Sequence, residues 1–247
     1  MRTSAVLLAL LLALITVPVA AAQTPATPQA SPATGVLMQL TLDQLPPDDV
    51  ATIGVTRTTF ATGGGLRAVA GSGPAVYFVE AGTISVTMDD GAGPLRVVRA
   101  GEPDGSATPQ SAETGTEAVL ETGTGFVLPA GSSAALQNAA ENPAIVLNVL
   151  SASDATIEAE EGVTHAVLVR QEVTLPKPPL LVSLALATIP PGGHLSLPDA
   201  PVLTRLAVVE RSQAFSLSGG GTTNRGTEPI DVYVLSFAPD DSQTSQC

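Results

Sequence analysis

The chain carries an internal repeat, and this repeat limits the possible folds more than any other feature of the sequence. At a fixed offset of 130 residues and without gaps, apolar positions and turn residues of the first half fall on equivalents in the second half. The matched residues are Leu45-Pro46 and Leu175-Pro176, Thr58 and Thr188, Gly63 and Gly193, Val79-Glu80 and Val209-Glu210, and Gly91 and Gly221. The pattern predicts a duplicated unit rather than one large domain.

The second copy is predicted to be shorter than the first. After Gly221 the offset falls to 86, because the segment that begins at Asn138 aligns with the segment that begins at Asn224 through a shared Asn-x4-Pro. The second copy therefore lacks about 44 residues, which correspond to 92–137 or thereabouts in the first. Because a unit without these residues would leave sheet edges open, we expect it to pack on the first copy or on a partner chain.

Both copies are predicted to be built from β-strands. From Val36 onward, short apolar runs rich in β-branched residues alternate with Gly, Pro and Asp, as in AVYFVEAGTISVTMDDG and AIVLNVLSA. Runs of this length and spacing are typical of an antiparallel sandwich or barrel. Helical periodicity is convincing only at the extreme N-terminus, so the fold class is all-β with an N-terminal signal helix.

The N-terminus resembles a secretory signal peptide. Residues 1–22 combine one charge at Arg2, an apolar run and a small-residue Ala20-x-Ala22 cleavage pattern. The alternative is an uncleaved anchor, although the run is shorter than the roughly 20 residues that a spanning helix needs. A Pro/Thr/Ala-rich linker is predicted over 23–37. We therefore expect a secreted or cell-envelope protein with no membrane contact after cleavage.

Charge and cysteine content narrow the function classes. The formal net charge of −13, with a sequence pI near 4.3, disfavours nucleic acid as a partner. The single cysteine, Cys247, is the last residue and cannot form an internal disulfide. It is either a free thiol on a tail at 241–247 or a link between two chains.

In the first copy, Gly123 is followed after five residues by Pro129-Ala130-Gly131, and after six further residues by Asn138. This spacing resembles the second motif of the cupin superfamily of small jelly-roll barrels, which runs Gly, five residues, Pro-x-Gly, two residues, His, three residues, Asn. Ala134 stands here at the place of the metal-binding histidine. The chain thus keeps the turn residues of the motif and lacks its ligand.

The first cupin motif shows the same departure. Gly63 and Gly82 have the expected separation, but Val69, Gly71 and Ala75 stand at the ligand places. In the second copy the corresponding places hold Asp199, Pro201 and Arg205. The resemblance implies a first cupin-like barrel over 38–152, a connector over 153–164 and a second, shortened unit over 165–240.

The residue supply argues against the usual chemistry of this family. A transition-metal site of cupin type needs about three imidazoles and a carboxylate. The chain has two histidines, His165 and His194, and neither stands at a ligand place. We therefore expect no metal, no cofactor and no catalytic residue.

Five residues are candidates for ligand binding. Alternation along AVYFVEAG places Tyr77 on the same face as Ala75, the face that looks into a cupin barrel. Ala134 would border the same space and leave volume for a ligand. In the second copy, Arg205 either forms an ion pair or binds an anion, and His194 is either an ordinary loop histidine or part of a site.

Three functions remain open. The first is an exported, metal-free, non-catalytic module that binds a small apolar or anionic molecule or another protein. The second is a metal-independent isomerase or epimerase that uses His194, Asp199, Tyr77 or Arg205, which would require these side chains to converge. The third is a structural envelope protein that assembles as a homodimer or with an envelope partner.

Overall fold

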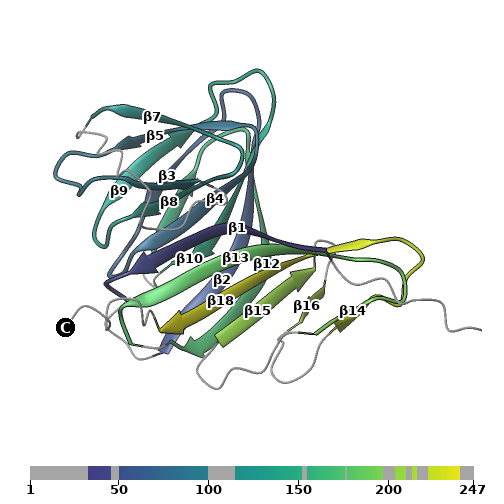
Figure 1. Cartoon of the computed structure of the whole chain (residues 1–247). Coiled ribbons are helices and arrows are strands. Elements are labelled where there is room, and N and C mark those ends of the chain that lie inside the picture. Colours follow the sequence, from purple (N-terminus) through teal and green to yellow (C-terminus); the bar gives the residue numbers. More distant parts are fainter. Residues whose placement is uncertain are drawn as a thin grey trace, which may run out of the picture.

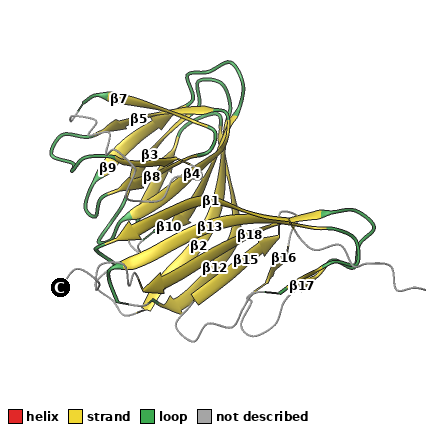
Figure 2. Cartoon of the chain, viewed as in Figure 1, coloured by secondary structure: helices red, strands yellow, loops and turns green. Residues whose placement is uncertain are grey.

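The computed structural model describes residues 33–45, 50–99, 115–151, 155–175, 177–196, 204–209, 213–215 and 222–239. The expected signal peptide at 1–22 and tail at 241–247 lie outside these ranges, as do Cys247 and Asp199. All regular structure in the described ranges is strand (Figure 2). These ranges contain no helix that is long and apolar enough to cross a membrane. The prediction of an all-β fold is therefore confirmed.

The described residues form eighteen strands in four antiparallel sheets (Figure 1). The strands are β1 (Ala33–Leu42), β2 (Val50–Phe60), β3 (Gly65–Val69), β4 (Ala75–Ala81), β5 (Thr83–Met88), β6 (Arg96–Arg99), β7 (Glu117–Glu121), β8 (Thr124–Leu128), β9 (Ser133–Gln137), β10 (Ala144–Leu150), β11 (Thr156–Ala159), β12 (Val163–Thr174), β13 (Leu180–Ile189), β14 (His194–Leu195), β15 (Thr204–Val209), β16 (Gln213–Phe215), β17 (Thr222–Thr223) and β18 (Ile230–Pro239). We name the sheets A (β1-β13-β18-β15-β16), B (β12-β2-β10-β4-β8-β6), C (β11-β3-β9-β5-β7) and D (β14-β17).

Sheets B and C form a jelly roll. Strands β2, β4, β8 and β10 lie in sheet B, whereas β3, β5, β7 and β9 lie in sheet C, so the chain passes back and forth between the two sheets. The orders β2-β10-β4-β8 and β3-β9-β5-β7 are those of an eight-stranded jelly roll. Apolar side chains from both sheets lie in the interior between them, among them Phe60, Phe126 and Met88. We call this unit the first barrel.

Sheet A repeats part of this arrangement. Its order β13-β18-β15 is equivalent to β2-β10-β4 of sheet B, and the short pair β14-β17 is equivalent to β3-β9 of sheet C. Strand β16 pairs with β15 inside sheet A, whereas β5 belongs to sheet C. Among its described residues, the second unit therefore has only the two-stranded sheet D at the place where the first barrel has the five-stranded sheet C.

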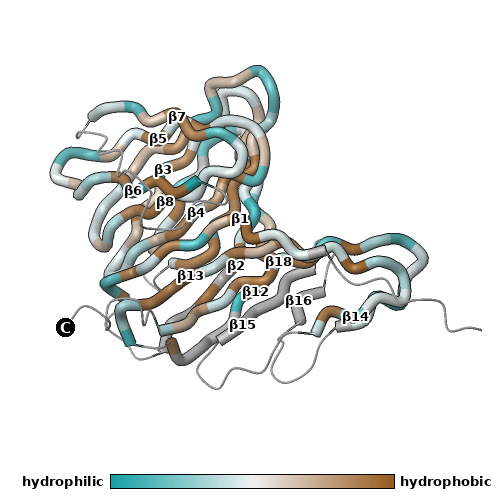
Figure 3. The backbone as a smooth tube through the Cα atoms, viewed as in Figure 1, coloured by the Kyte–Doolittle hydropathy of each residue, from teal (hydrophilic) through white to brown (hydrophobic). Residues whose placement is uncertain are grey.

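Sheet A packs on the outer face of sheet B. A second apolar cluster joins them, with Leu40 from β1, Val55 from β2 and Phe237 from β18 among its buried members. Figure 3 shows these hydrophobic stretches running along the strands of both sheets. The expectation that the shorter unit packs on the first one is therefore confirmed.

The first strand of each unit lies in the sheet of the other unit. Strand β1 pairs with β13 in sheet A, and β12 pairs with β2 in sheet B. Both strands carry a bulge, at Leu37 in β1 and at Leu168 in β12. The boundaries expected from the sequence, 38–152 and 165–240, assigned each strand to the opposite sheet, because sequence alone does not show which neighbour an edge strand will join.

Asn138 fastens the turn between β2 and β3 to the segment before β10. Its side-chain amide donates hydrogen bonds to the carbonyl oxygens of Phe60 (3.2 Å), Ala61 (3.2 Å) and Asn142 (2.9 Å). Its Oδ1 accepts a hydrogen bond from the backbone N–H of Ala140 (3.0 Å). Asn138 is fully buried, so these bonds satisfy a polar side chain inside the fold.

Asn224 makes the equivalent bonds in the second unit. Its amide donates to the carbonyl oxygens of Ile189 (2.9 Å) and Glu228 (2.7 Å), and its Oδ1 accepts from the N–H of Gly226 (2.9 Å). Two turns far apart in the sequence are therefore built in the same way.

These turns correct the fixed offset expected from the sequence. The N–H of Gly63 donates to the carbonyl oxygen of Asn138, and the N–H of Gly192 donates to that of Asn224, both at 2.8 Å. Both glycines have a positive φ, near +75° and +72°, which side chains rarely tolerate. Gly63 therefore matches Gly192 rather than Gly193, because a single-residue shift separates the turns from the strands that follow.

Candidate functional site

The interior of the first barrel is the candidate site, because strand alternation brings the predicted residues together there. On β4, Ala75, Tyr77 and Val79 face the core between sheets B and C, whereas Val76 and Phe78 face sheet A. The expected orientation of Tyr77 and Ala75 toward the barrel interior is therefore what the structure shows.

Four small side chains lie together in this interior. Ala134 on β9 is opposite Ala68 on β3 and Met88 on β5. Ala68, Ala70, Ala75 and Ala134 are all fully buried and belong to the same apolar cluster.

The ligand places on β3 need a correction of one residue. Val69 and Gly71 were expected there from their distance to Gly63, but the residues of β3 that face the interior are Ala68 and, just after the strand, Ala70. Because neighbouring side chains of a strand point to opposite faces, a shift of one residue changes which side chains look inward.

The residues present do not fit a metal. The places of a cupin-type site hold alanines, which offer no ligand atom. In the described part of the chain, no group of three or more His, Cys, Asp or Glu side chains is placed to hold a metal ion. The carboxylate of Asp89, just after β5, accepts hydrogen bonds from the side chains of Arg67 and Ser133.

Tyr77 and Asn148 form a polar pair inside the apolar interior. They are directly opposite each other on β4 and β10, and both are buried, with exposed fractions of 4% and 5%. Burial raises the pKa of Tyr77 well above its usual range, although a hydrogen bond with the Asn148 side chain lowers that pKa in part. The Tyr77 phenol therefore stays protonated at any physiological pH and cannot act as a base.

One atom of this pair lacks a partner. Asn148 Oδ1 is buried and has no hydrogen-bond partner within the described residues. The Tyr77 ring stacks on Phe126, with ring centroids 4.9 Å apart and planes inclined by 11°. The interior thus holds a stacked aromatic pair and, among the described residues, a buried amide oxygen without a hydrogen-bond partner.

The two histidines do not join this pair. His165 on β12 is exposed, and its Nδ1 lies 2.9 Å from Thr58 Oγ1. Neighbouring residues still remove part of its ring from water, and this desolvation lowers the pKa of His165. His194 is exposed in sheet D, where its Nδ1 lies 2.9 Å from Thr223 Oγ1. His194 and Tyr77 therefore belong to different units.

Arg205 can be placed by its backbone alone. It lies in β15, opposite Ser236 of β18. Its role in an ion pair or in anion binding stays a prediction.

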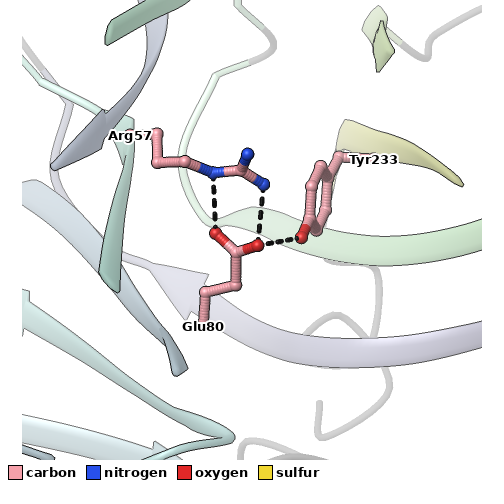
Figure 4. Close-up of polar contacts among 3 residues, drawn as sticks. All are labelled: Arg57, Glu80 and Tyr233. Atoms are coloured by element: carbon pink, nitrogen blue, oxygen red, sulfur yellow. Dashed lines mark hydrogen bonds and ion pairs between the residues drawn. The ribbon is translucent and has the colours of Figure 1, made fainter. Parts of the chain in front are cut away.

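A polar cluster between the two units was not expected from the sequence. Arg57 on β2 donates two hydrogen bonds to Glu80 on β4, from Nε to Oε2 (2.9 Å) and from Nη2 to Oε1 (2.7 Å). The hydroxyl of Tyr233 on β18 donates to Glu80 Oε1 (2.8 Å), as Figure 4 shows. The Arg57 guanidinium also lies 5.9 Å from the centre of the Tyr233 ring.

The Arg57, Glu80 and Tyr233 side chains form a cluster that holds the two units together. Burial, together with the hydrogen bond and the charge of Glu80, raises the pKa of Tyr233 above its usual range, so the phenol stays protonated and serves as a donor. A bidentate Arg–carboxylate pair fixes geometry well. Since the three side chains come from sheets A and B, the cluster ties the two units together. The only sequence signal was Glu80, a carboxylate that ends an apolar strand.

Fold and site together define the chain as an all-β protein with a cupin-like fold, within whose described residues no group of side chains is placed to hold a metal ion. The strand order of sheets B and C is that of a jelly roll, an architecture that cupins share.

Comparisons with known proteins find similar solved structures but no matching family model. No protein-family model and no curated protein matches the sequence. Among solved structures, the chain is similar to AerE from Microcystis aeruginosa, with a TM-score of 0.37 and 12% identity over 83% of this chain and 98% of that one. It is also similar to vicilin from Corylus avellana (hazelnut), with a TM-score of 0.34 and 14% identity over 73% of this chain and 71% of that one. Both have cupin folds, but likeness at this level carries no argument about function.

Proposed function

We propose that this protein is an exported, metal-free, duplicated cupin-like protein with a truncated second copy, which binds a small molecule inside its first barrel and performs no catalysis. The observation that carries the proposal is the set of four fully buried alanines, Ala68, Ala70, Ala75 and Ala134, at the place where a cupin-type site would carry its ligands. The jelly roll is kept, while the atoms that would do its chemistry are replaced by methyl groups.

Two further observations support binding rather than catalysis. Tyr77, the one ionisable side chain in the apolar cluster of the first barrel, stays protonated. His194 lies in sheet D, and Asp199 falls outside the described residues. A general acid or base must lie within hydrogen-bond reach of the group that it serves, and no such convergence supports an isomerase or epimerase.

The test is a thermal-shift screen of the mature protein, purified without a histidine tag, against small apolar and anionic compounds. Binding raises the melting temperature, because a ligand that binds only the folded state stabilises it by an amount that grows with the logarithm of the ligand concentration divided by Kd. Elemental analysis of the same sample should find less than about a tenth of an equivalent of any transition metal. If no compound raises the melting temperature, or if one metal ion per chain is present, the proposal is refuted.

A matched pair of variants locates the site. Ala134→Leu places a larger side chain in the barrel interior, whereas Ala135→Leu places it on the exposed face of the same strand. The first should abolish the ligand-induced shift and the second should preserve it. Equal effects of the two variants would place the site elsewhere.

A second candidate function, assembly with another copy or an envelope partner, is favoured by one observation. Val36 on β1 and Val167 on β12 sit just before the two bulges, and 52% and 67% of their surfaces are exposed. Exposed apolar residues on edge strands favour pairing with another chain. Sedimentation of the mature protein tests this, and a strictly monomeric chain would exclude self-assembly. N-terminal sequencing of that protein tests export, since cleavage after Ala22 leaves Gln23 first.

A further inference from the structure

We propose that the ligand of the first barrel is an uncharged molecule with an apolar body that donates one hydrogen bond to Asn148 Oδ1. This inference rests on the proposed function and specifies the chemistry that the interior site selects.

The position of Asn148 provides the first step. On β10, Ala144 and Val146 belong to the core between sheets B and C, whereas Leu147 and Val149 belong to the core that faces sheet A. Alternation along the strand therefore points Asn148 into the first barrel. Its direct neighbour across the ladder is Tyr77, whose ring also lies in that interior.

The hydrogen bonds of this pair provide the second step. The Asn148 side chain is a hydrogen-bond partner of the Tyr77 hydroxyl, yet its Oδ1 has none within the described part of the chain. A buried amide oxygen without a donor is unfavourable, because it has lost its bonds to water. A ligand that brings a donor into the barrel removes this cost, whereas a ligand with acceptors alone leaves it in place.

The absence of buried charge provides the third step. Among the described residues, the buried polar side chains are those of Thr58, Ser85, Thr124, Ser132, Asn138, Asn148 and Asn224, and none of them carries a charge. A charged ligand in this interior would lose its hydration without a counter-charge, which is costly. Of the two ligand classes expected from the sequence, apolar and anionic, the interior of the first barrel therefore favours the apolar one.

The walls of the site determine the rest of the ligand. Tyr77 and Phe126 stack on each other in the interior and contribute aromatic surface, and Ala75 and Ala134 add methyl groups. An apolar body packs against such walls, and its single donor fixes the orientation, as in most small-molecule sites. A small alcohol, primary amide or phenol meets this description.

The experiment compares alcohols with their ketones on the mature wild-type protein. Isothermal titration measures the affinity for 2-butanol and butanone, cyclopentanol and cyclopentanone, and cyclohexanol and cyclohexanone, with cyclopentanecarboxylate as the charged probe. The members of a pair have nearly the same size, but only the alcohol donates a hydrogen bond. We expect the alcohol of at least one pair to bind about tenfold more tightly than its ketone, and the carboxylate not to bind.

Two variants assign this preference to the carboxamide. Asn148→Leu keeps a side chain of similar size without the acceptor, so the alcohol should bind no better than the ketone. Thr58→Val is the matched control, since Thr58 is buried in the same unit but its hydroxyl already contacts His165; the preference should persist. In wild-type protein labelled at the asparagine side-chain carbonyl, the alcohol should shift the ¹³Cγ resonance of Asn148 and the ketone should not, which requires no variant.

The outcomes separate the inference from the proposed function. If alcohols and ketones bind equally, or if the carboxylate binds best, the inferred ligand class is wrong while binding in the barrel stands. If no compound of any pair binds, the proposed function fails together with it. An alcohol preference that survives in Asn148→Leu overturns the role of Asn148.

Discussion

Replacing Asn138 by alanine should destabilise the protein more than replacing any exposed residue nearby. The Asn138 side chain is fully buried and holds together two stretches of backbone, the end of β2 and the loop between β9 and β10. Alanine removes every one of these bonds and leaves the backbone partners without the side chain that satisfied them.

The expected magnitude follows from the bonds themselves. The amide nitrogen donates to the carbonyl oxygens of Phe60 and Ala61, which share it at 3.2 Å each, and to that of Asn142. The Oδ1 atom accepts from the N–H of Ala140. Counting the shared pair once gives about three hydrogen bonds, each worth about 1 kcal/mol net. The free energy of unfolding should therefore fall by about 3 kcal/mol, which lowers the melting temperature of a chain of this length by about 6–12 °C.

Urea denaturation followed by circular dichroism measures this loss. Asn142→Ala is the control, because the Asn142 side chain is exposed and only its backbone carbonyl is used; its cost should stay within about 0.5 kcal/mol. Asn224→Ala removes the equivalent bonds of the second unit and should shift the same single transition, since one apolar cluster joins sheets A and B. A loss below about 1 kcal/mol for Asn138→Ala, or equal losses for Asn138→Ala and Asn142→Ala, would refute the reasoning.

Three further predictions test other parts of the molecule. Tyr233→Phe removes the hydrogen bond to Glu80 and should cost about 1 kcal/mol in urea denaturation; no change would mean that the cluster does not tie the units together. Because the folded state lowers the pKa of His165 from its ordinary 6.5, the unfolded chain binds the proton first as the pH falls. That contribution to stability is present above about pH 6.5 and is lost below it, so between pH 7.5 and 5 wild type should lose more stability than His165→Gln; identical pH profiles would contradict this. In a Tyr77→Phe background, where no phenol depends on the carboxamide, Asn148→Leu should raise the ligand-free melting temperature, because it then removes only a buried acceptor without a partner; a lower melting temperature would assign Asn148 a structural role.

Local features of the fold could be predicted from the sequence. Glycine and Pro-x-Gly mark turns whatever a barrel contains, so Gly63, Gly82 and Gly131 indicated turns that the structure has, each with a positive φ. Strand alternation, a local rule, was enough to predict that Tyr77 and Ala75 share a face.

Features that depend on distant pairing could not be predicted. The exchange of β1 and β12 between sheets A and B depends on which neighbour each strand joins, and both choices suit the same apolar pattern. The bond between Glu80 and Tyr233 joins residues 153 positions apart. The shift from Val69 to Ala68 has a simpler cause, since spacing counted from a glycine does not determine which face each residue of the following strand points to.

The three asparagines buried in the described structure distinguish the residues that build the fold from those available for binding. Asn138 and Asn224 use both ends of the carboxamide on backbone groups of turns, and they do so in the same way in both units. Asn148 lies on a strand whose own backbone groups are paired, and its oxygen has no partner in the described residues. An aliphatic side chain like those of Val146 and Leu147 would remove the unpaired oxygen, but it would also remove the hydrogen bond with the buried Tyr77 hydroxyl. The carboxamide as a whole therefore has a partner in the fold, and its oxygen is the atom that the proposed ligand would satisfy.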